Sequence, residues 1–214
     1  MTFALFYDCE TQGLPLFKEP SEHPGQPHIV QLAACLVDLG TRKTIASMDV
    51  IVRPDGWTIP DDVAAIHGIT TEHAMDVGIP EAQAVDTFMS LWRGRLRVAH
   101  NQAFDARIMR IALKRHVDPR DTRLIIPPSD DWKASRAECT QLLSTPILAL
   151  PPTAKMRAAG RNHFKSANLR EAYKHFTGKE LENAHSAMAD VQGCMEVYFA
   201  IKGTPARAVH PAGE

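Results

Sequence analysis

The sequence of 214 residues has no apolar run long enough to cross a lipid bilayer, so a membrane-spanning helix is excluded. The N-terminal segment, residues 1–6, lacks the basic stretch that opens a signal peptide, and an acidic pair follows at once. We therefore interpret this segment as a first strand of the mature fold. We expect a protein of the cytoplasm with no membrane contact.

Paired cysteine motifs are also missing. The four cysteines form no CxxC pair and have no zinc-ligand spacing, which argues against a disulfide framework and a structural zinc site. Each lies among apolar residues, so we expect four buried thiols in a reducing compartment. They are Cys9, Cys35, Cys139 and Cys194.

A strong excess of one charge is missing as well, because the net charge is −1. The distribution is less even. Residues 155–174 hold six basic residues and one acid, Glu171, which gives +5 with histidine neutral. Basic flanks of this kind suit a polyanion held by its backbone, and a solvated helix face explains them equally well. A second basic group brackets Asp105 and consists of Arg93, Arg95, Arg97, Arg107, Arg110, Lys114 and Arg115.

Length and composition, with 44% hydrophobic and 23% charged residues, are typical of one globular domain. Apolar or alternating patterns predict strands, and the turn across residues 38–43 would join two of them in a hairpin. These strands are 3–8, 29–38, 47–52 and 96–99. Periodicity and capping signals predict helices. They are 80–92 with Pro80 in the first turn, 102–116, one beginning within 139–143, one capped by Ser166 and ended by Gly178, and 186–201.

Proline, glycine and charge mark the remaining segments as irregular. We predict loops at 117–136 and 151–165, the second of them basic and mobile. Residues 1–202 would form one domain, followed by a flexible tail, 203–214. Early strands followed by strand–helix alternation indicate an α/β sheet covered by helices on both faces.

Four acidic residues and one histidine occur in three short segments. The first segment is Phe6-Tyr7-Asp8-Cys9-Glu10-Thr11, the second is His100-Asn101-Gln102-Ala103-Phe104-Asp105, and the third is His185-Ser186-Ala187-Met188-Ala189-Asp190. Four carboxylates that converge repel one another unless divalent cations lie among them. A histidine beside them can take a proton from water. This combination predicts hydrolysis of phosphodiesters with two metal ions.

Each segment is ambiguous when taken alone. Asp8 and Glu10 would share one face of a strand, with Cys9 on the other, where a buried strand emerges from the sheet. An acid such as Asp105 in the first turn of a helix is also favoured by the helix dipole. Asn101 is also explained as the N-cap of that helix. The five-residue spacing of His185 and Asp190 does not fit one helix face, so His185 should lie at or before the helix start.

Carboxylate ligands favour Mg²⁺ or Mn²⁺ over zinc, which prefers histidine and cysteine. Two such ions at roughly 3.5–4 Å would activate water and stabilise the leaving oxygen. A histidine with a pKa of roughly 6.5 is a suitable general base at neutral pH.

The three segments, in order and spacing, resemble the DnaQ-like (DEDDh) 3′–5′ exonucleases of the RNase H-like superfamily. Their motifs DxE, HNxxFD and HxxxxD match Asp8 to Glu10, His100 to Asp105 and His185 to Asp190. A further segment, Val63 to Thr70, is similar to the family's HGI loop. The resemblance covers about residues 3–201.

The resemblance implies a central mixed sheet of five strands, flanked by helices, in which the second strand is antiparallel to the rest. It implies that two divalent cations bind to Asp8, Glu10, Asp105 and Asp190, with Asp8 shared, and that His185 is the general base. It also suggests residues that hold the terminal nucleotide. These candidates are Thr11, Asp62, Ile66, His67, Asn101 and Phe104, although Phe104 also fits a core position and His67 a packed turn.

The expected activity is removal of nucleoside 5′-monophosphates from the 3′ ends of single-stranded DNA. The segments 14–28 and 118–137 are longer than in many relatives, so an RNA-directed enzyme of the same fold stays open as the alternative. A stand-alone exonuclease is favoured over a proofreading subunit, because no long C-terminal extension follows the last motif. Docking of a replication or repair partner elsewhere stays open, as does the oligomeric state.

Two further classes compete with the enzyme. A non-catalytic nucleic-acid-binding module would keep the fold without turnover, but all five catalytic positions hold the required residue types. A structural or interaction protein would carry these acids as surface residues. It predicts that replacing Asp8 or Asp190 changes neither activity nor metal binding.

Overall fold

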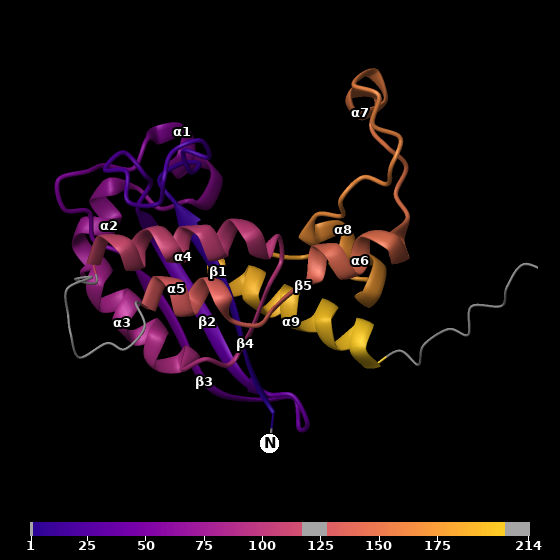
Figure 1. The fold of residues 1–214 in the computed structure, drawn as a ribbon, viewed down its shortest axis with the longest axis horizontal. Helices are drawn as coiled ribbons and strands as arrows, with labels where there is room; N and C mark the ends of the chain where they lie inside the picture. The colour runs from indigo at the N-terminus through magenta and orange to yellow at the C-terminus, as the bar shows by residue number, and fades with distance from the viewer. Residues whose placement is uncertain (1, 117–127, 204–214) are drawn as a thin grey trace, which may run out of the picture.

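The computed structural model describes residues 2–116 and 128–203. Its centre is a five-stranded sheet in the order β3-β2-β1-β4-β5 (Figure 1). Strand β2 is antiparallel to both β1 and β3, whereas β4 is parallel to β1 and to β5. This arrangement confirms the predicted mixed sheet with one antiparallel strand. The strands are β1 (Phe3–Thr11), β2 (Ile29–Asp38), β3 (Lys43–Ile51), β4 (Leu96–Ala99) and β5 (Ala137–Cys139).

Helices cover both faces of this sheet (Figure 1). They are α1 (Asp61–His67), α2 (Thr71–Val77), α3 (Glu81–Trp92), α4 (Gln102–His116), α5 (Pro128–Ala134), α6 (Thr140–Leu148), α7 (Ala154–Ala158), α8 (Leu169–Thr177) and α9 (Ala187–Gly203). No described helix is both long enough and apolar enough to span a bilayer.

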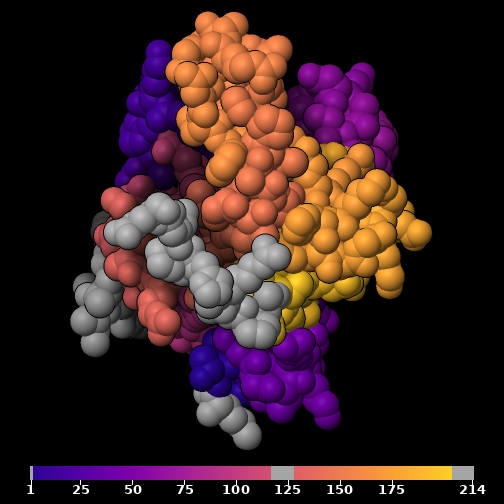
Figure 2. Space-filling model, turned by 90° about the vertical axis from the view of Figure 1, so that its right-hand side faces the viewer, coloured from indigo at the N-terminus to yellow at the C-terminus, as the bar shows by residue number. Residues whose placement is uncertain are grey.

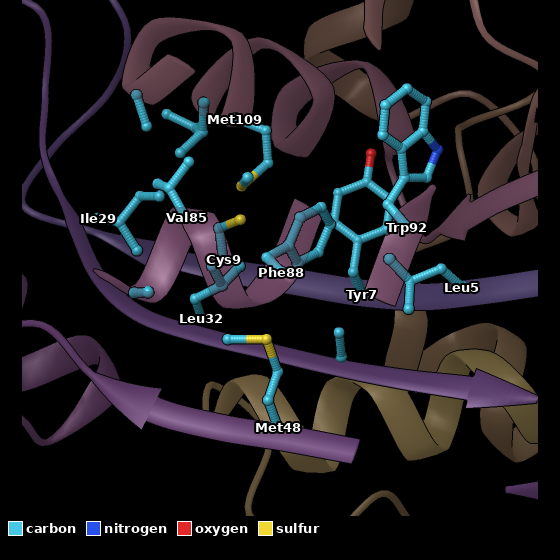
Figure 3. Packing of buried hydrophobic residues seen from close by; sticks show 14 of the residues in the cluster. Leu5, Tyr7, Cys9, Ile29, Leu32, Met48, Val85, Phe88, Trp92 and Met109 are labelled. Atoms are coloured by element: carbon cyan, nitrogen blue, oxygen red, sulfur yellow. The ribbon is translucent and has the colours of Figure 1, made fainter. Parts of the chain in front are cut away.

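The alternating residues of β1 divide the core into two layers. On one face Leu5, Tyr7 and Cys9 pack against α3, α4 and α5, as Figure 3 shows for the labelled side chains. The ring of Tyr7 lies edge-on to those of Phe88 and Trp132, with centroids 5.4 and 5.5 Å away. Such aromatic pairs add to the apolar burial that stabilises this layer.

The opposite face of β1 carries the second layer. Ala4 and Phe6 pack there against α9, and the ring of Phe6 meets that of Tyr198 edge-on at 5.1 Å. Because β1 is apolar on both faces up to Tyr7, it lies in the middle of the sheet, and the first polar side chains appear only where it emerges.

A buried carboxylate joins three elements at the edge of the first layer. Glu81 at the start of α3 accepts the backbone N–H of Ile29 at 2.9 Å and contacts His28, Arg115 and His116. These partners hold the pKa of Glu81 well below its usual range, against the opposing effect of burial. The carboxylate therefore connects α3, the start of β2 and the end of α4.

Two predicted loops are partly helical. Helix α5 lies within the predicted loop 117–136, because Trp132 is fully buried and its indole N–H donates to the carbonyl of Ala106 at 2.9 Å. The short helix α7 lies within 151–165, where the side chain of Thr153 caps it. Residues 117–127 and 204–214, which include most of the predicted tail, lie outside the described part of the chain.

Several predicted boundaries shift. Strand β3 begins at Lys43 rather than at residue 47, and Pro80 is the N-cap of α3 rather than a first-turn residue. Asn168, not Ser166, caps α8, because its side chain and that of Glu171 form a reciprocal capping box. Gly178 ends this helix in the left-handed conformation, as predicted.

The cysteines are free in the described structure, but only three are buried. Cys139 is half-buried at the end of the edge strand β5, where one side has no neighbouring strand. The expectation of four buried thiols is wrong for this residue.

Candidate active site

The C-terminal end of β1 carries two carboxylates on the face that looks toward α9. Asp8 and Glu10 lie there, while Cys9 points into the layer formed by α3 and α4. The backbone N–H of Cys9 donates to Oδ1 of buried Asp105 at 3.1 Å. This hydrogen bond links the first turn of α4 to β1 and brings the second acidic segment to the first.

His185 precedes α9 and has a φ of 73°, a backbone conformation that non-glycine residues rarely adopt. Its backbone N–H donates to Oδ2 of Asp190 at 3.4 Å, and the N–H of Asp190 donates to the carbonyl of Ser186 at 3.0 Å. The chain therefore turns sharply ahead of the helix, which explains how residues five apart reach one point.

The start of α9 is fixed to the sheet by Gln31 of β2. Its side-chain oxygen accepts the N–H of Ala187 at 3.1 Å, and its amide donates to Asp49 at 2.7 Å. Asp190 therefore has a defined position relative to β1 and β2.

Among the described residues, one group offers potential metal ligands close together. Ligand atoms of Glu10, His185 and Asp190 all lie within 4.8 Å of one another. Oδ1 of Asp190 is buried and has no hydrogen-bond partner in the described structure. A buried carboxylate oxygen without a partner is costly, and a cation would remove that cost.

Burial raises the pKa of every carboxyl in this cluster, and repulsion by neighbouring carboxylates adds to the rise for Asp8, Glu10 and Asp105. The pKa of Glu10 rises to about 7, chiefly through burial and then through the charge of Asp190. Burial also raises the pKa of Asp8 well above its usual range, with further increases from Asp105, Asp190 and Glu10. The pKa values of Asp105 and Asp190 are raised by burial too. Without cations, the cluster therefore disfavours full ionisation at neutral pH.

A pocket of about 490 Å³ adjoins Glu10. Five of the six predicted substrate-binding residues line it: Thr11, Asp62, Ile66, His67 and Phe104. Asn101 does not line it. Asn101 is an exposed residue with a φ of 60°, and its carbonyl, rather than its side chain, accepts the N–H of Phe104 at the start of α4.

The pocket also contains a residue that the motifs did not indicate. Leu14 is 74% exposed and lines the pocket together with the exposed Ile66 and the half-buried Phe104. The signal available in the sequence was a leucine between Gly13 and Pro15, a few residues after the DxE motif. Leu14, Ile66 and Phe104 give the pocket an apolar lining beside an acidic centre.

The imidazole of His67 has one engaged and one unengaged nitrogen. Nδ1 accepts the N–H of Ile69 at 3.1 Å, which assigns the proton to Nε2. Nε2 is buried and has no partner in the described structure. Burial and the charge of His185 lower the pKa of His67, so it stays neutral and can donate through Nε2.

The exonuclease family model RNase_T matches residues 5–198 of this sequence. The chain belongs to this exonuclease family. The match covers all three acidic segments and confirms the resemblance to the DnaQ-like exonucleases. The chain is thus an exonuclease-type hydrolase with the RNase H-like fold.

Solved structures share the fold of this exonuclease. E. coli exonuclease I in complex with a dT13 oligonucleotide matches with a TM-score of 0.69 and 21% identity over 94% of this chain. The zinc-bound E. coli ExoI–ssDNA complex gives a TM-score of 0.67 and 21% identity over 95% of this chain. A moderately thermophilic exonuclease I from Methylocaldum szegediense matches with a TM-score of 0.68 and 19% identity over 95% of this chain. The chain spans 41% of the length of each of these structures. No curated protein matches the sequence.

The basic group around Asp105 serves the exonuclease mainly as structure. The guanidinium of Arg97 lies 4.2 Å from the ring centroid of Trp132 and donates to Ser135, and Arg95 donates to carbonyls at the end of α3. Arg107 donates to the carbonyls of Leu16 and Glu19, and Arg115 contacts Glu81. These four side chains therefore have partners within the protein, so a solvated helix face does not describe them either.

His100 of the second motif is likewise a connecting residue. Its Nδ1 lies 2.9 Å from Oγ1 of Thr140 and its Nε2 lies 3.0 Å from the carbonyl of Ala167. Burial lowers its pKa. His100 therefore ties the end of β4 to α6 and to the segment that leads into α8.

Proposed function

We propose that this exonuclease removes nucleoside 5′-monophosphates from the 3′ ends of single-stranded DNA and depends on two divalent cations, Mg²⁺ or Mn²⁺. The observation that carries the proposal is the approach of ligand atoms of Glu10, His185 and Asp190 to within 4.8 Å of one another, beside a pocket that Glu10 also lines.

The donor set fits such cations. Carboxylate oxygens are the ligands that Mg²⁺ and Mn²⁺ prefer, and one of them, Oδ1 of Asp190, lacks any partner in the described structure. Burial, and after it repulsion by neighbouring carboxylates, raises the pKa of Asp8, Glu10 and Asp105, and nearby cations would favour their ionised forms. We assign cation binding to Asp8, Glu10, Asp105 and Asp190.

When bound, the cations supply an activated water and positive charge at the leaving oxygen. His185 has the role of general base, because its side chain is exposed and stands beside this cluster. The hydrogen bond from its backbone to Asp190 positions the imidazole without engaging either ring nitrogen. His185 also lies among the potential ligands, so its role as base has to be separated from metal binding by experiment.

The pocket beside Glu10 accounts for action at a strand end. The apolar surfaces of Leu14, Ile66 and Phe104 suit the faces of an unstacked terminal base. The buried Nε2–H of His67 suits an oxygen of the terminal sugar or phosphate. Thr11 and Asp62 line the same pocket and complete the proposed nucleotide-binding set, whereas Asn101 stands apart from it.

DNA is favoured over RNA by the structures that share this fold. The E. coli enzyme among them is described in complexes with dT13 and with single-stranded DNA. The RNA-directed alternative differs only in the contacts made to a 2′-hydroxyl.

The test is cleavage of 5′-labelled single-stranded DNA and RNA of matched sequence with Mg²⁺, Mn²⁺ or EDTA. We expect a ladder that shortens from the 3′ end, requires metal and forms faster on DNA. Faster cleavage of RNA would replace the DNA proposal by the RNA alternative. Binding without turnover in either metal would instead support a non-catalytic module.

His185→Ala tests the assignment of the base. We expect a fall in kcat of about 10²–10⁴ with unchanged metal affinity, since a base contributes that much to the rate. The matched control is His73→Ala, which removes an exposed imidazole that lies on α2, outside the cluster, and it should behave like the wild type. A weakened metal affinity in His185→Ala alone would reassign this residue as a ligand.

A further inference from the structure

Residues 150–166 form an arm that projects from the body of the molecule and carries α7 near its tip (Figure 1). The arm stands at the end of the sheet where β1 finishes, which is also the end that holds the acidic cluster. Figure 2 shows it rising above the body, with the 12–28 segment and the α1 region rising at the same end.

The arm is basic, and two of its four Lys and Arg side chains have partners, because Arg157 donates to the carbonyl of Pro152 and Lys165 pairs with Glu171. No acidic residue occurs between Glu138 and Glu171. Lys155 and Arg161 are exposed, and no hydrogen bond or ion pair holds either side chain within the described ranges 2–116 and 128–203. Long cationic side chains that face water without partners are available to a polyanion.

The arm also exposes an aromatic ring. Phe164 is 49% exposed, although a residue of this type is ordinarily placed in a core. An aromatic ring among cations is the combination on which the bases of a single strand stack while its phosphates are neutralised.

The base of the arm is fixed to α6 and to the end of β4. The N–H of Lys165 donates to the carbonyl of Leu150 at 3.0 Å and joins the two sides of the arm. Beyond this point, the N–H of Ala167 donates to Oγ1 of Thr145, and the carbonyl of Ala167 contacts His100. His100 lies in the same motif as Asp105, so the arm has a defined attachment beside the cluster.

We propose that this arm binds the phosphate backbone of the single strand upstream of the end being hydrolysed, through Lys155 and Arg161, with a base stacked on Phe164. The inference rests on the proposed function, because it assumes that the ligand is a single-stranded nucleic acid. It assigns the arm to affinity and not to the chemical step.

Binding in EDTA tests the arm without turnover. Oligothymidylates from roughly 4 to roughly 16 nucleotides cover the usual range of single-strand sites. We expect Lys155→Ala/Arg161→Ala to bind the longer strands about tenfold more weakly and to bind the shortest strand like the wild type. Each lost phosphate contact lowers the slope of log K against log salt by about 0.7, so the double variant should lose about 1.4.

Phe164→Ala distinguishes stacking from charge. We expect it to weaken binding of the longer strands severalfold with no change in the salt slope, because no cation is removed. The control for charge is Lys43→Ala/Arg93→Ala, which removes two exposed cations where β3 and β4 begin, at the other end of the sheet. This control should retain both the affinity and the slope of the wild type.

The outcomes separate the arm from the proposed function. If the wild type cleaves strands but the arm variant and the control bind alike at every length, the inference about the arm is overturned and the function stands. If strands bind through the arm but are not cleaved in any metal, the proposed function fails and the inference stands. Equal affinity for RNA and DNA of each length supports backbone contacts, and a wild type that binds neither strand overturns the inference.

Discussion

At the scale of single residues, environment alters the acid–base chemistry of ordinary side chains. Glu10 is one member of a common DxE triplet, yet burial and the charge of Asp190 raise its pKa to about 7. His67 loses basicity through burial, whereas Glu81, also buried, has its pKa lowered because four neighbouring groups stabilise its charge. The partners of a buried carboxylate therefore decide whether it is a candidate ligand or a structural anchor.

The raised pKa of Glu10 predicts a pH dependence of stability in the metal-free protein. The folded state binds the proton more tightly than the unfolded chain, in which the pKa is near 4.5. The stabilisation is therefore fully present below about pH 4.5 and is lost as the pH rises to about 7. For Glu10 the shift corresponds to about 3 kcal/mol.

We expect the free energy of unfolding, measured with urea in EDTA, to fall across this range in the wild type. The fall should be smaller in Glu10→Gln, which cannot ionise. The pKa values of Asp8 and Asp105 are also raised, so the variant should still show part of the fall in stability with pH. Superimposable curves for the two proteins would contradict the raised pKa of Glu10.

At the scale of elements, the surroundings of the site depend on a few buried polar anchors in irregular segments. The segment 12–28 contains no regular structure, yet Gln26 is only 2% exposed within it. Its side chain accepts the N–H of Leu16 at 3.0 Å and donates to the carbonyls of Leu16 and Pro20 at 3.1 and 2.9 Å. Gln26 thus holds the segment that presents Leu14 to the pocket.

Replacing Gln26 by Ala should loosen this segment, because several backbone groups lose their partner at about 1–3 kcal/mol each. We expect faster amide exchange across 13–26 and a severalfold higher KM, with kcat little changed. Glu19→Ala is the control in the same segment, because the described contacts of Glu19 are made by its backbone. Equal exchange in both variants would show that Gln26 does not hold the segment.

Gly78 allows the end of α2 to lie close to the backbone of Arg53, just after β3. A Cβ on Gly78 would lie 2.3 Å from the carbonyl oxygen of Ala74 and 2.5 Å from the backbone nitrogen of Arg53. Both are backbone atoms, so relief requires movement of α2 or of the chain at Arg53.

We therefore expect Gly78→Ala to lower the free energy of unfolding by about 3 kcal/mol, as overpacking does. Chemical denaturation would measure the loss. Gly40→Ala is the control, because its Cβ would meet only the Asp38 side chain at an ordinary 3.4 Å. A Gly78→Ala protein as stable as this control would show that the close approach relaxes without cost.

At the scale of the whole molecule, the sheet brings together three segments that are far apart in the chain. Parallel pairing of β1 with β4 and the packing of α9 across β1 and β2 bring all four carboxylates to one end. In the absence of cations this convergence opposes folding, and in their presence it favours the folded state.

Metal binding should therefore stabilise the whole fold. At a free metal concentration of about 100 times Kd, we expect the free energy of unfolding to rise by about 2.7 kcal/mol. Asp8→Ala should lose most of this increase and should melt at a higher temperature than the wild type in EDTA, since one repelling carboxylate is gone. Thermal melting with and without Mg²⁺ measures both effects. An unchanged metal-free melting temperature would argue against convergence at Asp8.

The sequence alone determined a large part of this description. Residues 3–7 are apolar and are followed by Asp8 and Glu10, which predicted a buried strand whose end carries the carboxylates of the candidate active site. The five-residue spacing of His185 and Asp190 predicted the break ahead of the last helix. Order and spacing of the motifs indicated the family and, through it, the mixed sheet. Local pattern suffices for the buried strand and for the break before the last helix, because each of these depends on residues that are neighbours in the chain.

Tertiary structure decided the rest. By sequence, the arginines around Asp105 fit a polyanion surface and a solvated helix face equally well, but Arg97 and Arg107 contact residues far away in the chain. Helix α5 forms in an expected loop because a distant layer buries Trp132. Leu14 belongs to the pocket and the basic segment stands out as an arm only once the chain is folded. Long-range contacts settle these positions, and no local pattern of residue types encodes which partner a side chain will meet.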